Sequence, residues 1–89
     1  MKNKDTEELR SALREADQRL ALLLQQRYFL VSQIGLLKKQ DGEPPEQQAE
    51  WQAKRDYLAS LIEKDASRVY VLGIFDEIHK RSVDLQKGL

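Results

Sequence analysis

The chain has 89 residues, enough for one small domain spanning residues 1–89 with a modest core of its own. Its 15 basic and 15 acidic residues leave no net charge, so composition gives no sign of a nucleic-acid partner or an anionic membrane. There is no cysteine, no apolar core of a signal peptide and no apolar run that approaches the length of a membrane span. We therefore expect a soluble, cytoplasmic protein.

The first predicted element is a very long amphipathic helix from about Asp5 to Gln40. Gly42, which follows it, suits the left-handed position after a helix end. About 36 residues at helical rise span roughly 54 Å, whereas a compact chain of this length is only about 30 Å across. Apolar residues recur along the whole helix at steps of three and four: Leu9, Leu13, Ala16, Leu20, Leu23, Leu24, Leu30, Val31, Ile34 and Leu37. The simplest cover for this stripe is a second copy of the chain, so we expect an intertwined homodimer. A kink near Gly35 and an open coiled coil are the alternatives.

Two shorter helices are predicted after Pro44-Pro45, with Pro45 in the first turn of the second helix. The second helix is predicted over residues 45–64 and the third over residues 67–87, separated by a short break. No window alternates with the period of a strand. The predicted fold class is therefore all-α, with three helices per chain.

Arg27 lies in the middle of the apolar stripe, where a guanidinium is costly unless an anion pairs with it. No acidic residue of the same stripe is spaced to do so, which favours an external anion. The alternative is that Arg27 reaches the surface or meets a carboxylate of another helix. Lys38 follows at about three turns and shares the azimuth of Arg27 at roughly 16 Å, so both could converge on one small ligand. Arg10 lies about 25 Å from Arg27 along the axis and could join such a site only from a second subunit.

The third predicted helix carries Ser82 and Gln86 on or beside its apolar seam. Because they are four residues apart, both side chains point the same way. Taken alone, a serine and a glutamine near a helix end are ordinary.

Taken together, Leu9-Arg10, Arg27, the segment Ile34–Lys38 with Gly35, and the segment Ser82–Gln86 resemble the all-helical chorismate mutases in order and spacing. The resemblance implies an intertwined dimer that converts chorismate, a small dicarboxylate, to prephenate without a cofactor or a metal ion. It further implies that Arg27 and Arg10 of the partner subunit bind the two carboxylates, with Ser82 assisting. Lys38 and Gln86 would flank the ether oxygen, which gains negative charge in the transition state.

The second predicted helix departs from the family pattern of an acidic residue followed by an Arg-Glu pair. The corresponding positions here are Gln47, Glu50 and Trp51. Gln47 and Glu50 could still bind the ring hydroxyl of chorismate, with Trp51 as a packing residue. Alternatively, the site acts as a mutase or pyruvate lyase on a relative such as 4-amino-4-deoxychorismate or isochorismate. A third reading is a non-catalytic helical dimerisation or regulatory module. His79 is interpreted as a surface residue, and no metal site is expected.

Overall fold

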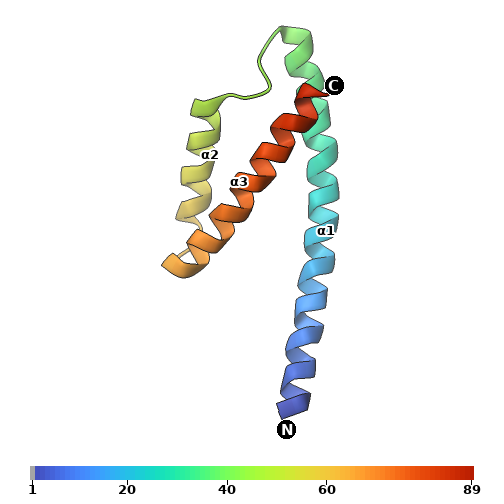
Figure 1. Ribbon diagram of the computed structural model, residues 1–89, viewed down its shortest axis with the longest axis vertical. Coiled ribbons are helices and arrows are strands. Elements are labelled where there is room, and N and C mark those ends of the chain that lie inside the picture. Colours follow the sequence, from blue (N-terminus) through green and yellow to red (C-terminus); the bar gives the residue numbers. More distant parts are fainter. Residues whose placement is uncertain (1) are drawn as a thin grey trace. The chain divides into compact units, whose positions relative to one another are not determined.

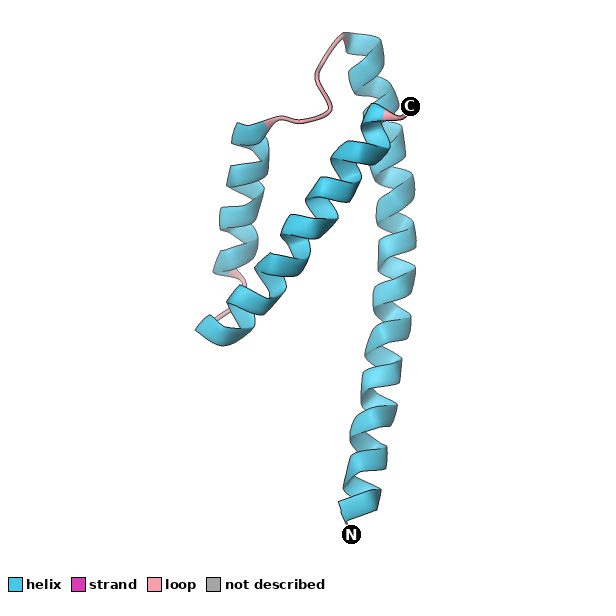
Figure 2. Cartoon of the chain, viewed as in Figure 1, coloured by secondary structure: helices cyan, strands magenta, loops and turns pink. Residues whose placement is uncertain are grey.

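The computed structural model describes residues 2–89, with side chains from Asp5 onward (Figure 1). Within this range the chain forms three helices and no strand: α1 (Lys2–Asp41), α2 (Gln48–Ser60) and α3 (Asp65–Lys87). Figure 2 shows the helices and the loops that join them. The predicted all-α class is confirmed. The chain divides into two compact units, Met1–Leu30 and Val31–Leu89, called here the first and the second unit.

The end of α1 is fixed by Gly42, whose φ of 73° lies in the left-handed region as predicted. The backbone N–H of Gly42 donates to the carbonyl of Lys39 at 3.3 Å, and that of Glu43 donates to Lys38 at 2.8 Å. These two bonds form a Schellman motif, which satisfies carbonyls that the helix end would otherwise leave open. The helix runs to Asp41 and passes through Gly35 without a break.

The second helix is shorter than predicted at both ends. Gln47, with an extended backbone, is its N-cap, so Pro44-Pro45 stay in the preceding loop. The prediction that Pro45 lies in the first turn is therefore wrong. At the other end the helix stops at Ser60, and the break before α3 falls at residues 61–64 instead of 65–67.

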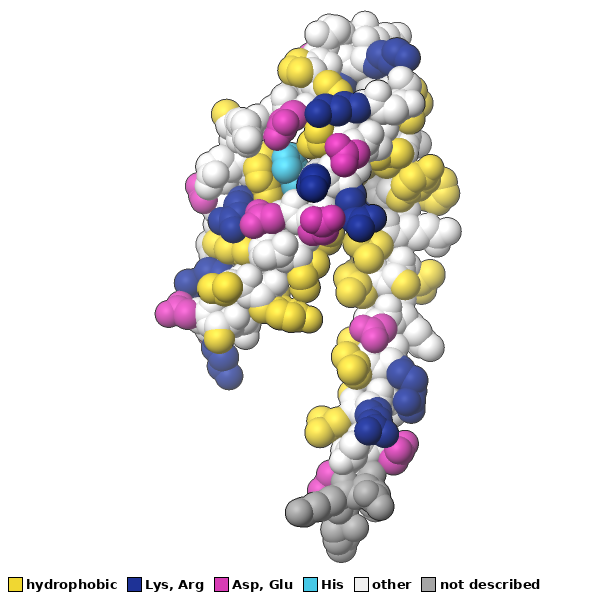
Figure 3. All heavy atoms as spheres, viewed as in Figure 1, with side chains coloured by type: hydrophobic (Ala, Val, Ile, Leu, Met, Phe, Trp, Pro, Cys, Tyr) yellow, Lys and Arg dark blue, Asp and Glu magenta, His cyan; other side chains and the backbone are white. Residues whose placement is uncertain are grey.

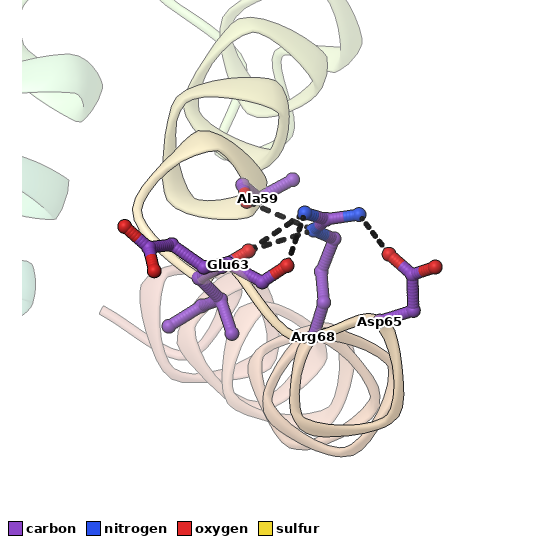
Figure 4. Close-up of polar contacts among 5 residues, drawn as sticks. Ala59, Glu63, Asp65 and Arg68 are labelled. Carbon is purple, nitrogen blue, oxygen red and sulfur yellow. Dashed lines mark hydrogen bonds and ion pairs between the residues drawn. The ribbon is translucent and has the colours of Figure 1, made fainter.

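The early end of α2 is stabilised by a guanidinium from the first turn of α3 (Figure 4). Arg68 Nε donates to the carbonyl of Ala59 at 3.1 Å and to that of Ile62 at 3.0 Å, and Nη2 donates to Ile62 at 2.7 Å. Its Nη1 bonds Asp65 Oδ1 at 2.9 Å. Because the last carbonyls of a helix have no partner within it, a side chain that reaches them allows the chain to turn here. Asp65 also places a negative charge at the start of α3, where the helix dipole favours it.

The small core of the second unit joins the last turns of α1 to α3. Val31, Leu72 and Val83 are its buried apolar residues, each less than one-tenth exposed. Gly35 is buried as well. The helix α2 is held to α3 by the paired side chains of Arg55 and Asp76.

Apolar side chains of the first unit lie on the surface of the chain (Figure 3). The exposed fractions of Leu9, Leu13 and Leu20 are 72%, 61% and 50%. Among residues 5–30 only Arg27 is partly buried. Within the described chain, the apolar side chains of this unit are therefore not covered.

One stretch of Asp5–Asp41 is long and apolar enough to cross a membrane, with a mean hydropathy of 1.2 over 18 residues. The prediction that no apolar run approaches this length is therefore wrong. Core helices of soluble proteins meet the same criterion, so this stretch does not show a membrane protein.

Candidate active site

Lys38 and Gln86, which were predicted to flank one reacting atom, are in direct contact. Lys38 Nζ donates to Gln86 Oε1 at 3.3 Å and to the carbonyl of Pro45 at 3.0 Å. Gln86 Nε2 donates to the carbonyl of Val31 at 3.0 Å. Both side chains are partly buried, and they come from α1 and α3, 48 residues apart in sequence. The fold therefore brings these two predicted residues to one place.

The two side chains keep hydrogen-bond donors for a ligand. An ammonium has three hydrogens and an amide nitrogen has two. Two of the three are used at Lys38 and one of the two at Gln86. One donor on each therefore remains, and the first carries a positive charge. Two adjacent donors of this kind suit an oxygen atom on which negative charge develops.

Lys38 is positioned by the end of its own helix. It lies in the last turn of α1, where the carbonyl end of the helix dipole favours a cation. The turn at Gly42 then brings the carbonyl of Pro45 to the ammonium. The loop after α1 thus restrains the lysine side chain.

Ser82 lies one turn before Gln86 on α3 and is partly buried. Its Oγ donates to the carbonyl of Ile78 at 2.8 Å, the usual bond of a serine to the preceding helical turn. To donate to a substrate carboxylate, the hydroxyl hydrogen would have to turn away from Ile78.

The two arginines predicted to bind carboxylates belong to the first unit. Burial lowers the pKa of Arg27, because a partly desolvated guanidinium is less stable in its charged form. Arginine remains protonated near neutral pH even so. Arg10 is exposed, and its Nη1 lies 4.0 Å from Glu7 Oε1. Their convergence with Lys38 stays a prediction.

The predicted hydroxyl-binding residues stand at the start of α2. Gln47 Nε2 donates to Glu43 Oε2 at 3.4 Å, and Glu50 is exposed in the first turn. Trp51 stacks on His79, with ring centroids 4.1 Å apart and 5° between the planes. Trp51 is thus a packing residue, as interpreted from the sequence.

The interpretation of His79 as a surface residue is wrong. Only 21% of its side chain is exposed, because the ring of Trp51 covers one face. Its Nε2 lies 3.9 Å from Glu46 Oε1. In the part of the chain that the structure describes, no group of three or more His, Asp or Glu side chains is arranged to hold a metal ion.

A comparison with known protein families identifies the family of this chain. Residues 9–87 match the family model of chorismate mutase type II. The chain belongs to this family. The predicted family is confirmed, and the match includes every residue predicted for the site. No curated protein and no solved structure gives a match.

Two members of the site were missed in the sequence because they act through their backbones. The carbonyls of Val31 and Pro45 hold Gln86 and Lys38, and no residue type marks such a role. Gly35 did carry a signal, since a glycine inside a helix is unfavourable and calls for a reason. From the sequence, a kink near Gly35 was one alternative to a homodimer, whereas the structure shows an unbroken helix at Gly35 and a close approach to α3.

Proposed function

We propose that this chain is a chorismate mutase, which converts chorismate to prephenate by a Claisen rearrangement within one molecule. No proton is transferred and no covalent intermediate with the protein forms. The enzyme holds the substrate in its compact conformer and stabilises charge as the ether bond breaks. The contact between Lys38 and Gln86, in a chain of this family, is the observation that carries the proposal.

Each predicted residue then has a separate task. Lys38 and Gln86 donate to the ether oxygen as its bond to carbon lengthens and negative charge accumulates there. Arg27 and Arg10 of the partner subunit bind the two carboxylates, because a guanidinium fork meets a carboxylate with two hydrogen bonds. Ser82 assists one carboxylate. Gln47 and Glu50 bind the ring hydroxyl.

A cytoplasmic homodimer is part of the proposal. Its support is the exposed apolar surface of the first unit, where Leu9, Leu13 and Leu23 are each more than half exposed. Exposed apolar side chains repeated along a helix support a protein–protein interface. Sedimentation equilibrium of the purified chain would give the mass of a dimer, and a folded monomer would contradict it.

Incubation with chorismate tests the reaction. Loss of chorismate with formation of prephenate, identified by chromatography, is the expected result. Gln86→Ala should lower kcat about 100-fold to 1,000-fold, the usual loss when one donor to a developing oxyanion is removed. Gln52→Ala is the matched control, because Gln52 is exposed on α2 and bonds Asp56 one turn away. A folded dimer without turnover would overturn the proposal.

A mixing experiment tests whether the site is shared between subunits. Arg10→Ala and Arg27→Ala should each be nearly inactive as homodimers. In a mixed dimer one site lacks both arginines and the other lacks neither, so equal mixing should restore about a quarter of the wild-type activity. Mixtures that stay inactive after subunit exchange would mean that Arg10 and Arg27 of different subunits do not form one site.

One observation favours a second candidate, in which the substrate is a relative of chorismate. Trp51 stands where the family usually has a glutamate, and its ring stacks on that of His79. A site that lacks this carboxylate could accept an amine in place of the ring hydroxyl, or isochorismate. Parallel incubations with 4-amino-4-deoxychorismate and isochorismate distinguish the candidates by which substrate gives the highest kcat/KM. If none reacts, a dimerisation or regulatory module remains.

A further inference from the structure

Gly35 is buried directly against Gln86. A Cβ atom built on Gly35 would lie 2.7 Å from Gln86 Cγ, 3.3 Å from Gln86 Cβ and 2.7 Å from Leu89 Cδ1. Non-bonded carbon atoms rest at about 3.5–4.0 Å. Even the smallest side chain at this position would therefore force a neighbour to move.

The three neighbours differ in how easily they can move. Leu89 Cδ1 is the end of a flexible side chain near the C-terminus, so it can turn away at little cost. The Cβ and Cγ atoms of Gln86 connect its amide to the backbone of α3. They cannot be displaced without moving the amide or the helix.

At its observed position, the side-chain amide of Gln86 can form both of its hydrogen bonds in only one of its two flipped orientations. Its Nε2 faces the carbonyl of Val31 and its Oε1 faces the ammonium of Lys38. Turned by half a rotation, the amide would set oxygen against oxygen at Val31 and donor against donor at Lys38. The direction of the remaining N–H hydrogen is thereby fixed.

We propose that Gly35 is a positioning residue for the mutase reaction: its missing side chain lets Gln86 pack against α1, where Val31 and Lys38 aim the free N–H of the amide at the reacting oxygen. This inference rests on the proposed function. Gly35 touches no substrate and acts through Gln86. Its place inside a helix, where alanine is favoured over glycine, is explained by the space that Gln86 needs.

Gly73 supplies a matched control. It also lies inside a helix, α3, but a Cβ atom there would have no neighbour within 4 Å. Gly35→Ala should lower kcat about 100-fold, the loss expected from a displacement of about 1 Å in a reacting group, with little change in KM. Gly73→Ala should leave kcat unchanged. Equal activity of the two variants would overturn the inference.

A double variant separates positioning from general packing. If Gly35 acts through Gln86, adding Gly35→Ala to Gln86→Ala should cause no further loss of kcat, because the sensitive group is already gone. A further loss would overturn the inference. Should Gly35→Ala alone fail to fold, a folded double variant supports the inference, and an unfolded one contradicts it because the space would then serve something other than the Gln86 amide.

The side-chain amide of Gln86 can also be followed without any substrate. In ¹⁵N-labelled protein, one of its two hydrogens should exchange slowly with solvent because it is bonded to Val31. Gly73→Ala should keep this protection and Gly35→Ala should lose it. Absence of turnover by the wild type would remove the proposed function while this measurement still tests the positioning. Protection retained in Gly35→Ala would overturn the positioning alone.

Discussion

The indole of Trp51 lies flat against the imidazole of His79, and this contact ties the start of α2 to α3. Glu46, just before α2, approaches the same imidazole at 3.9 Å. Arg55 and Asp76 join the two helices one turn further on. An aromatic pair and an ion pair thus hold α2 against α3 in this chain.

The stacking of Trp51 on His79 should be measurable as a coupling energy in a double-mutant cycle. Trp51→Ala and His79→Ala should each lower the free energy of unfolding, and the double variant should lower it by about 0.5–1.5 kcal/mol less than the sum, as for other ring pairs. Urea unfolding of the four proteins measures this. Strict additivity would mean that the rings are neighbours without mutual stabilisation. Trp51→Phe keeps a ring in place and should retain both stability and turnover.

The pair of Arg55 and Asp76 should make stability depend on pH at the acid end. Arg55 Nε and Nη2 bond the two carboxylate oxygens at 2.8 and 3.0 Å. The hydrogen bond from Arg55, helped by the charges of Arg55 and His79, holds the pKa of Asp76 below its usual value. A carboxyl with a lowered pKa in the folded state stabilises the fold above its unfolded pKa, about 3.9. That contribution is lost as the pH falls through the lower folded value.

Asp76→Asn is the variant that tests this pH dependence. It should be less stable than the wild type at pH 7, and the difference should shrink as the solution is acidified below about pH 4. The side chains of Arg55 and Asp76 are 33% and 47% exposed, and solvent screens their interaction. The loss of stability should therefore be modest and smaller in high salt. Urea midpoints that fall in parallel for both proteins would contradict the assignment.

Removing the guanidinium of Arg68 should loosen the connection between α2 and α3. Arg68→Met keeps the apolar stem and removes the donors to Ala59 and Ile62, so the free energy of unfolding should fall by about 1–3 kcal/mol. Arg68→Lys should recover only part of this, because an ammonium has no fork to reach both carbonyls. Arg81→Met is the control, since Arg81 is 80% exposed and bonds Glu77 of its own helix. An equal loss in both variants would argue against the capping role.

A glutamate at position 86 should give the mutase an acid pH optimum. A neutral amide donates at any pH, whereas a carboxyl donates only when protonated. Lys38, 3.3 Å from Gln86 Oε1, would favour the ionised form of that carboxyl. For Gln86→Glu, kcat should therefore rise as the pH falls, while the wild type stays nearly flat over the same range. A flat profile for the variant would mean that position 86 does not donate to the reacting oxygen.

The sequence was a good guide to features that depend on periodicity and residue type. The long first helix, the left-handed Gly42 and the family all followed from spacing along the chain. The C-terminal end of α2 did not, because it depends on Arg68, which bonds the backbone carbonyls of Ala59 and Ile62, and a carbonyl has no sequence signature. Likewise, the family resemblance assigned Lys38 and Gln86 to one site, but their direct contact and the carbonyls of Val31 and Pro45 that orient them were not predicted.

The double attachment of Lys38 to the loop after α1 links loop order to ligand binding. Its carbonyl accepts the N–H of Glu43 and its ammonium donates to Pro45, so one residue fastens the loop by main chain and side chain together. A ligand that draws the ammonium away from Pro45 releases one of these fastenings. Such a ligand would therefore couple occupancy of the site to the mobility of the loop that leads into α2, whereas a ligand that uses only the third ammonium hydrogen would leave the loop fastened.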